Sequence, residues 1–102
     1  MQNETYLSVV RHRIREARLA RGLRQEDVAE AAGLQLRSYQ RFEARKPEQG
    51  SFNPTLVSIR AISQALGVEL EALGGEPSAQ ELEAVKKAAR RERGRPRKTT
   101  DE

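Results

Sequence analysis

Residues 35 to 44 carry the side chains best placed to hydrogen-bond a planar partner. Tyr39 and Phe42 recur at helical spacing and are expected to face inward. The outer side of the same short helix then presents Leu36, Arg37, Gln40 and Arg41. An arginine fork matches the two acceptors on the edge of guanine, and a leucine can pack on the methyl group of thymine. Such a face, on a helix narrow enough for the major groove, favours base recognition in DNA.

Other kinds of site lack the residues that they need. His12 is the only histidine, cysteine is absent, and the carboxylates are scattered along the helices. A metal centre or a nucleophilic triad requires clustered partners. No phosphate-cradling loop of the G-x-x-x-x-G-K type occurs either. We therefore expect no enzyme, no metal and no cofactor.

Length and charge narrow the class further. A chain of 102 residues with 36% apolar residues suits one modest helical core. The net charge is +4, but residues 86–98 hold eight basic residues and one acidic one, so the rest of the chain is net acidic. A polyanion would therefore be bound through a local basic face. No apolar run is long enough for a membrane helix and cysteine is absent, so a cytoplasmic protein without membrane contact is expected.

The elements that must position these side chains follow from apolar periodicity. A first helix ending at Gly22 is predicted by the stripe Tyr6, Leu7, Val10, Ile14 and Ala17. A short second helix begins at Gln25, and Gly33 separates it from the third, which reaches about Ala44. Two helices can cross steeply only where small residues meet, and Ala29 with Gly33 is expected to supply them.

The second half of the chain predicts three more helices. After an exposed loop at 45–53 the pattern restarts at Pro54, and a fourth helix is predicted from Leu56, Ile59, Ile62, Ala65 and Leu66. Gly67 ends it, and Val68, Leu70 and Leu73 suit a short fifth helix. Ser78 can cap a last helix, with Glu81 at the capping-box position.

The sequence thus predicts an all-α fold with three parts. Residues 6–75 form a five-helix helix-turn-helix domain, and residues 76–93 form a charged C-terminal helix that is weakly packed because its apolar residues are sparse. Residues 94–102 form a basic, disordered tail, since they include no apolar side chain to bury.

The segment LRQEDVAEAAGLQLRSYQRFEARK, residues 23 to 46, resembles the XRE-like helix-turn-helix of phage repressor and Cro proteins. RIREARLARGL at 13 to 23 is similar to that family's first helix, and NPTLVSIRAISQALGVELEAL at 53 to 73 to its fourth and fifth. The resemblance implies a repressor-like fold and double-stranded DNA as the partner.

The resemblance also implies roles for individual residues. The family's base-reading positions fall on Leu36, Arg37 and Arg41, with Gln40 at the edge of the contact. The phosphate-holding positions fall on Gln25 and Gln35, with Ser38 beside the base-reading set. The family also pairs an arginine of the first helix with the glutamate that closes the third, which here are Arg18 and Glu43.

One part of the chain departs from the family pattern. Arg45 stands where the family usually has glycine, and the stretch from Glu43 to Pro54 is longer than usual. Arg45, Lys46 and Asn53 could still reach the phosphate backbone, or the loop could simply be solvated.

The basic tail contains a second motif. Arg93, Gly94, Arg95, Pro96, Arg97 and Lys98 resemble the core of an AT-hook. An extended segment of this kind can lie in a narrow A·T-rich minor groove, where negative potential attracts arginine. Nonspecific phosphate binding and simple solubilisation are the alternatives.

The resemblance further implies a homodimer on a short palindrome, with recognition helices roughly 34 Å apart. The dimer surface is expected near the fourth and fifth helices, at Leu70, Leu73 and the helix from Ser78. A transcriptional repressor is the leading hypothesis. An antitoxin with a toxin partner, a restriction-modification controller, and a protein-interaction module without DNA binding are the alternatives.

Overall fold

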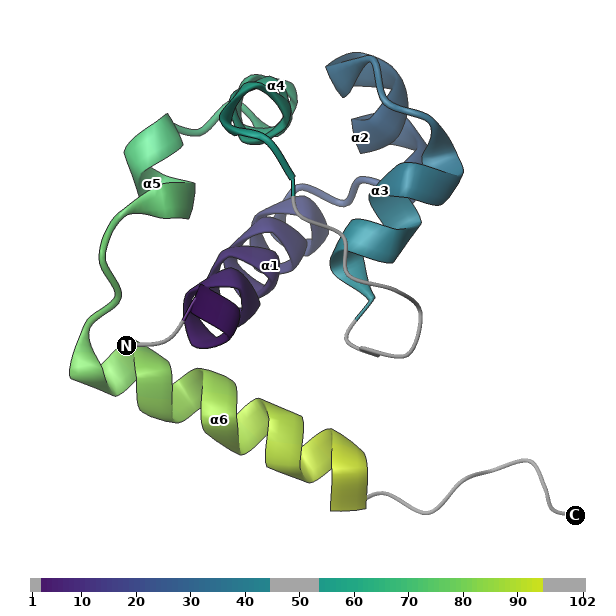
Figure 1. The fold of residues 1–102 in the computed structure, drawn as a ribbon. Helices are drawn as coiled ribbons and strands as arrows, with labels where there is room; N and C mark the ends of the chain where they lie inside the picture. Colours follow the sequence, from purple (N-terminus) through teal and green to yellow (C-terminus); the bar gives the residue numbers. More distant parts are fainter. Residues whose placement is uncertain (1–2, 45–53, 95–102) are drawn as a thin grey trace, which may run out of the picture.

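A computed structural model describes residues 3–44 and 54–94, with side chains described for residues 5–44 and 54–88. The described residues form six helices and no strand: α1 (Asn3–Ala20), α2 (Gln25–Ala32), α3 (Leu36–Glu43), α4 (Leu56–Leu66), α5 (Leu70–Gly74) and α6 (Ala79–Gly94). In Figure 1, α1 runs through the middle, α2 and α3 lie on one side of it, and α6 crosses beneath it. The predicted all-α class is confirmed.

The turn between α2 and α3 depends on the backbone conformation of Gly33. Its φ is 72°, in the left-handed region that costs other residues free energy. This conformation lets Leu34 N–H donate to the carbonyl of Ala29 at 2.8 Å, which closes the end of α2. A Cβ at Gly33 would meet nothing within 4 Å. The prediction that Gly33 makes room for a helix crossing is therefore wrong, because its backbone and not its size is required.

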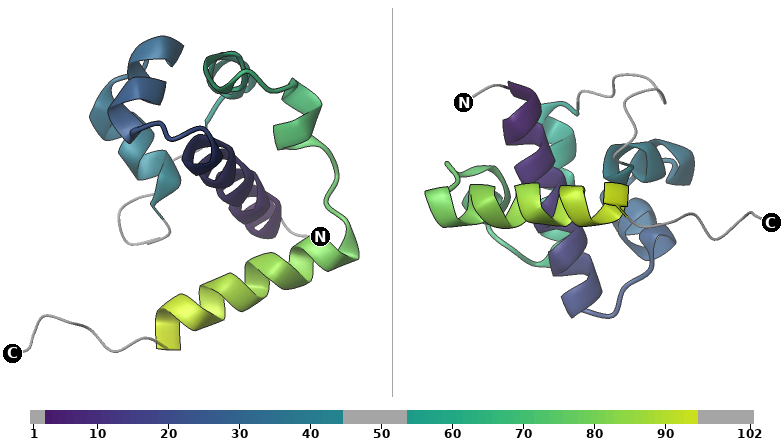
Figure 2. Two further views of the ribbon diagram at one scale, coloured as in Figure 1. Left: turned by 180° about the vertical axis from the view of Figure 1, so that it is seen from behind. Right: turned by 90° about the horizontal axis from the view of Figure 1, so that it is seen from below.

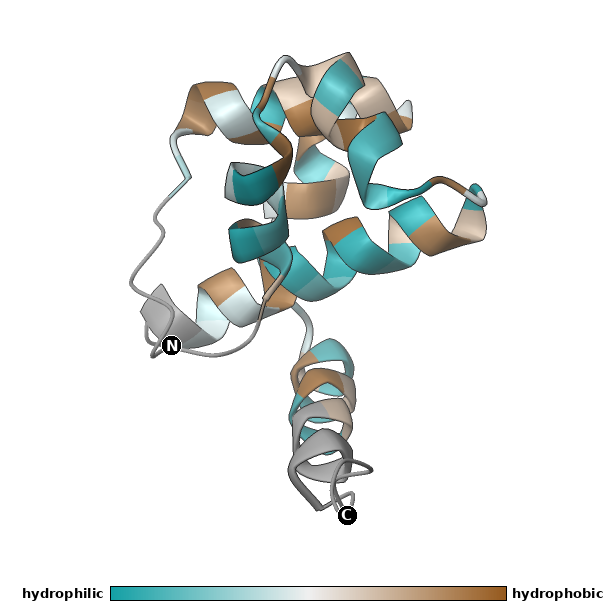
Figure 3. Ribbon diagram, turned by 90° about the vertical axis from the view of Figure 1, so that its right-hand side faces the viewer, coloured by the Kyte–Doolittle hydropathy of each residue, from teal (hydrophilic) through white to brown (hydrophobic). Residues whose placement is uncertain are grey.

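The hydrophobic core lies between α1 and two pairs of helices, α2 with α3 and α4 with α5. Apolar side chains from five helices are almost fully buried in one cluster: Val10, Ile14, Val28, Ala29, Tyr39, Phe42, Ile62, Leu66 and Leu73. Each large side chain of this kind contributes about 1.5–3 kcal/mol when it leaves water. Brown and teal bands alternate around the helices in Figure 3, as amphipathic helices around a shared core require.

Helix α6 packs against α1, as the two views of Figure 2 show. Ser78 caps it, because its hydroxyl accepts a hydrogen bond from Glu81 N–H at 3.1 Å. The Glu81 carboxylate accepts a backbone hydrogen bond from Ser78, as the capping-box position predicts, and it also binds Arg13 of α1. Val85 is only 7% exposed, and Val9 of α1, which the predicted apolar stripe omitted, is fully buried. The helix is therefore anchored more firmly than its sparse apolar residues predicted.

Candidate nucleic-acid interface

Helix α3 presents two distinct faces. Tyr39 and Phe42 point into the core, with exposed fractions of 0% and 1%. The side chains on the opposite face are all exposed: Leu36, Arg37, Gln40 and Arg41. The structure thus brings together the four residues that the sequence proposed for base contact, on one short helix.

The start of α3 adds unpaired polar groups beside this face. Gln35 is the residue before the first turn, and its side chain makes no capping hydrogen bond. Its exposed amide and the backbone N–H groups of the first turn therefore point outward, where they suit an anion. Ser38 is half-buried and lies one residue from Arg37 along the helix.

Glu43 joins three helices through hydrogen bonds. Arg18 of α1 donates to both of its carboxylate oxygens, at 2.8 and 3.0 Å, and also to the carbonyl of Leu23 at 2.9 Å. The Tyr39 hydroxyl donates to the same carboxylate. Gln25 of α2 donates its amide N–H to Glu43 at 2.9 Å. The pair that the resemblance implied is thus present, and it belongs to a larger network.

The network also sets the protonation of its members. Burial opposes the charge of Glu43, but hydrogen bonds from Arg18, Tyr39 and Gln25 outweigh it and hold its pKa below the ordinary value. Burial and the hydrogen bond to Glu43 raise the pKa of the Tyr39 hydroxyl. Glu43 is therefore ionised and Tyr39 is neutral near neutral pH.

Gln25 is held more tightly than a free phosphate ligand would be. Its Nε2 donates to Glu43, and its Oε1 accepts a hydrogen bond from Gln40 Nε2 at 3.5 Å. The side chain therefore links the buried pair to the outer face of α3. One amide N–H of Gln25 is left for an external acceptor.

The sequence interpretation missed two arginines beside this network. Arg15 and Arg24 line a hollow of about 530 Å³ together with Gln25, Leu36 and Gln40. Arg15 lies one helical turn before Arg18, so its place on this side could have been read from helical spacing. The place of Arg24 could not be read from helical spacing, because it immediately precedes α2. There it forms exposed ion pairs with Glu26 and Asp27.

Several predicted contacts lie outside the described residues. These are Arg45, Lys46 and Asn53 in the loop, and Arg95, Pro96, Arg97 and Lys98 in the tail. Arg93 and Gly94 form the last residues of α6, so helix occupies the first position assigned to the disordered tail. An extended minor-groove segment starting at Arg93 would require this end of the helix to unwind.

Within residues 3–44 and 54–94, no three His, Cys, Asp or Glu side chains gather in a way that could hold a metal ion. None of the described helices is long and apolar enough to cross a membrane.

A glycine turn joins α2 to α3, and α3 is a short helix with a polar outer face. This arrangement defines a helix-turn-helix DNA-binding domain. Comparison with known families matches residues 14–73 to the helix-turn-helix family model. This is more than half of the chain, which therefore belongs to the XRE-type helix-turn-helix family of DNA-binding transcription regulators. No curated protein and no solved structure gives a match.

Proposed function

We propose that this protein is a sequence-specific transcriptional repressor that binds a short palindromic operator as a homodimer. The observation that carries the proposal is the outer face of α3, which exposes Leu36, Arg37, Gln40 and Arg41. Hydrogen bonds to Glu43 hold the inner face of the same helix in place. Anchoring matters because a base contact discriminates only when the side chain is presented in a fixed register.

Arg37 is the residue proposed to read guanine, and Leu36 the residue proposed to contact a thymine methyl. Leu36 remains 38% exposed although it is apolar, which leaves a surface that a partner can cover. Gln40 donates one amide N–H to Gln25, so its carbonyl oxygen and its second amide N–H are left to face the bases. That oxygen would accept from adenine N6 or cytosine N4.

The proposed phosphate contacts surround this face. Gln25 would use its remaining amide N–H, while Gln35 and Ser38 would act beside the first turn of α3. Arg45, Lys46, Asn53 and the basic tail remain proposals drawn from the sequence. With DNA as the partner, the cytoplasm is the proposed compartment.

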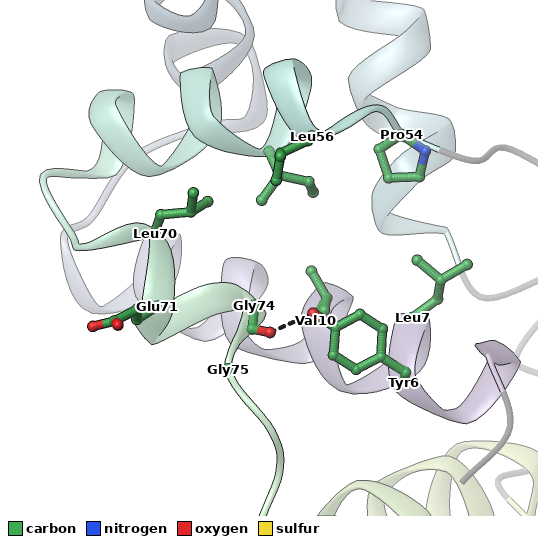
Figure 4. A pocket seen from close by; sticks show the side chains of 10 residues that line it. Tyr6, Leu7, Val10, Pro54, Leu56, Leu70, Glu71, Gly74 and Gly75 are labelled. Carbon is green, nitrogen blue, oxygen red and sulfur yellow. Dashed lines mark hydrogen bonds between the residues drawn. The ribbon is translucent and has the colours of Figure 1, made fainter.

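The homodimer is proposed because one such domain reads only half of a palindrome. Leu73 cannot contribute its side chain to a partner, since it is 2% exposed and belongs to the core. Leu56 and Val57 at the start of α4 are 72% and 77% exposed. Leu56 also lines an apolar groove of about 400 Å³ between α1, α4 and α5, shown in Figure 4, as does Leu70. We therefore move the proposed contact surface to the beginning of α4.

An antitoxin or a restriction-modification controller would use the same interface and differ in its genetic neighbour. A toxin encoded beside this protein, and bound by it, would favour the antitoxin. The exposed arginines of α3 weigh against an interaction module without DNA binding.

The proposal is tested by selecting bound duplexes from a random pool with the wild-type protein, Arg37→Ala and Arg60→Ala. The wild type should enrich an inverted repeat with one guanine at the same place in each half. Arg37→Ala should relax that position, because the fork that reads it is gone. Arg60→Ala removes the same charge from α4 and should keep the wild-type preference. Recovery of the same sequence with Arg37→Ala would overturn the assignment.

A further inference from the structure

Arg13 of α1 clamps the point where α6 begins. Its guanidinium donates to both oxygens of Glu81, at 2.6 and 2.7 Å. It also donates to the carbonyl oxygens of Leu73 and Gly75, at 2.7 and 2.8 Å. One side chain therefore ties together α1, the end of α5 and the first turn of α6.

A second contact one helical turn later fixes the direction of α6. Val85 follows Glu81 by four residues, so both lie on the face that α6 turns toward α1. Val85 is buried, and so is Val9, which precedes Arg13 by one turn on α1. A helix held at two points along its length cannot swing freely about either one.

The direction of α6 brings its C-terminal end toward the side of α2 and α3. Figure 1 and the right-hand view of Figure 2 show that α6 starts on the side of α5, crosses α1 and ends on the side of α2 and α3. At about 1.5 Å per residue, the helix continues roughly 13 Å beyond Val85 to its end at Gly94. Its far end therefore extends toward the side that carries the base-reading face.

Charge is divided along the same axis. The start of α6 contains Glu81 and Glu83, whereas Lys86 and Lys87, both exposed, lie at the middle of the helix. The sequence adds Arg90, Arg91 and Arg93 before the helix ends, against Glu92 alone. The acidic half thus stays on the α5 side, and the basic half lies on the α3 side.

We propose that the Arg13 clamp aims the basic half of α6 at the DNA phosphates that flank the site read by α3. Arg13 and Glu81 are positioning residues in this account and do not touch the DNA themselves. The inference rests on the proposed function, because it needs a duplex seated against α3. Basic residues held in a fixed direction neutralise phosphates on flanking DNA and contribute affinity without base preference.

Two variants of α6 with the same change in charge test the proposal. Glu81→Gln weakens the clamp, and Glu83→Gln removes an exposed carboxylate for which the structure shows no contact with α1. Both raise the net charge by one, which by itself favours binding to DNA. Ser78 caps the helix through its own hydroxyl, so Glu81→Gln leaves that cap in place.

Binding of the full chain is measured on the selected duplex with short and with extended flanks, at several salt concentrations. The wild type should gain affinity from the extended flanks, and Glu81→Gln should lose most of that gain in spite of its added positive charge. Its salt slope should fall by about 0.9 for each phosphate that α6 no longer neutralises. Glu83→Gln should bind as the wild type does or more tightly.

Equal behaviour of the two variants would overturn the proposal, as would a wild type that gains nothing from flanking DNA. Circular dichroism and urea unfolding monitor whether the core of Glu81→Gln remains folded. Should that variant be unfolded, Arg13→Lys provides the second test, because it keeps the charge but cannot make four directed hydrogen bonds. The proposed function fails separately if the wild type shows no base preference on either duplex.

Discussion

At the scale of single residues, Glu43 is the group on which the geometry of the interface depends most. It is 7% exposed and closes a helix of only eight residues. Hydrogen bonds from Arg18, Tyr39 and Gln25 converge on its carboxylate, so a change on one helix is felt on the others. A buried charge of this kind costs much free energy once a partner is removed.

Arg18→Ala is therefore expected to lower the free energy of unfolding by about 3–5 kcal/mol, because it leaves Glu43 buried without its cation. Urea unfolding followed by circular dichroism measures the decrease. Arg24→Ala is the matched control, since its ion pairs with Glu26 and Asp27 are exposed and are screened by water. An unchanged unfolding midpoint in Arg18→Ala would contradict a structural role for the pair.

The same network predicts how stability depends on pH. The pKa of Glu43 is lower in the folded protein than in the unfolded chain, where the carboxyl keeps the ordinary value of glutamate. Its contribution is therefore present above that value and is lost as the pH falls through the lower folded pKa. Urea midpoints measured from pH 6 to pH 2.5 should decrease less steeply for Glu43→Gln than for the wild type. The lowered pKa values of Glu81 and Asp27 leave part of the slope in both proteins.

Glu30→Gln serves as the reference for this comparison, because Glu30 is an exposed glutamate of α2. It should retain the wild-type slope. Identical slopes for the wild type and Glu43→Gln would show that Glu43 is not linked to folding.

Residue roles were predictable from the sequence where helical period decides them. Tyr39 and Phe42 had to share one face of α3 and Arg37 had to lie on another, whatever the neighbouring helices did. The engagement of Gln25 with both Glu43 and Gln40 was not predictable in this way. It depends on which rotamer brings an amide at the start of α2 to two residues of α3, and no spacing within one helix encodes that.

At the scale of elements, the angle between α2 and α3 rests on one backbone conformation. Gly33→Ala is expected to cost about 1–2 kcal/mol of stability, because alanine must adopt the left-handed conformation at a φ of 72°. Gly33→Asn should cost less, since asparagine tolerates that region better. Urea unfolding separates the two. Equal costs would indicate a steric cause, against the open space found beside this glycine.

The packing of α6 shows where element prediction from sequence stops. Its helical period and its Ser78 cap were visible, as were its sparse apolar residues Leu82, Val85 and Ala88. The clamp was not, because Arg13 is one of many arginines and two of its four hydrogen bonds go to backbone carbonyl groups. Every residue has a backbone carbonyl group, so the type of the accepting residue does not reveal such a hydrogen bond.

At the scale of the whole molecule, the exposed apolar surface at the start of α4 predicts the dimer contact. Leu56→Gln combined with Val57→Gln should weaken self-association about a hundredfold or more, because each side chain loses roughly 1.5–3 kcal/mol of burial. Sedimentation velocity measures the dissociation constant. Leu19→Gln is the control, since Leu19 is 50% exposed at the end of α1. Dimers that persist unchanged in the double variant would place the interface elsewhere.

The central claim is that α3 chooses the DNA sequence through Arg37. The most direct test is the ratio of the Kd for an unrelated duplex to the Kd for the selected one, measured at one salt concentration. Arg37→Ala should lower this ratio by about 5- to 150-fold for each half-site, which corresponds to about 1–3 kcal/mol. Its Kd for the unrelated duplex should change no more than that of Arg60→Ala. A wild-type ratio in Arg37→Ala would contradict the claim.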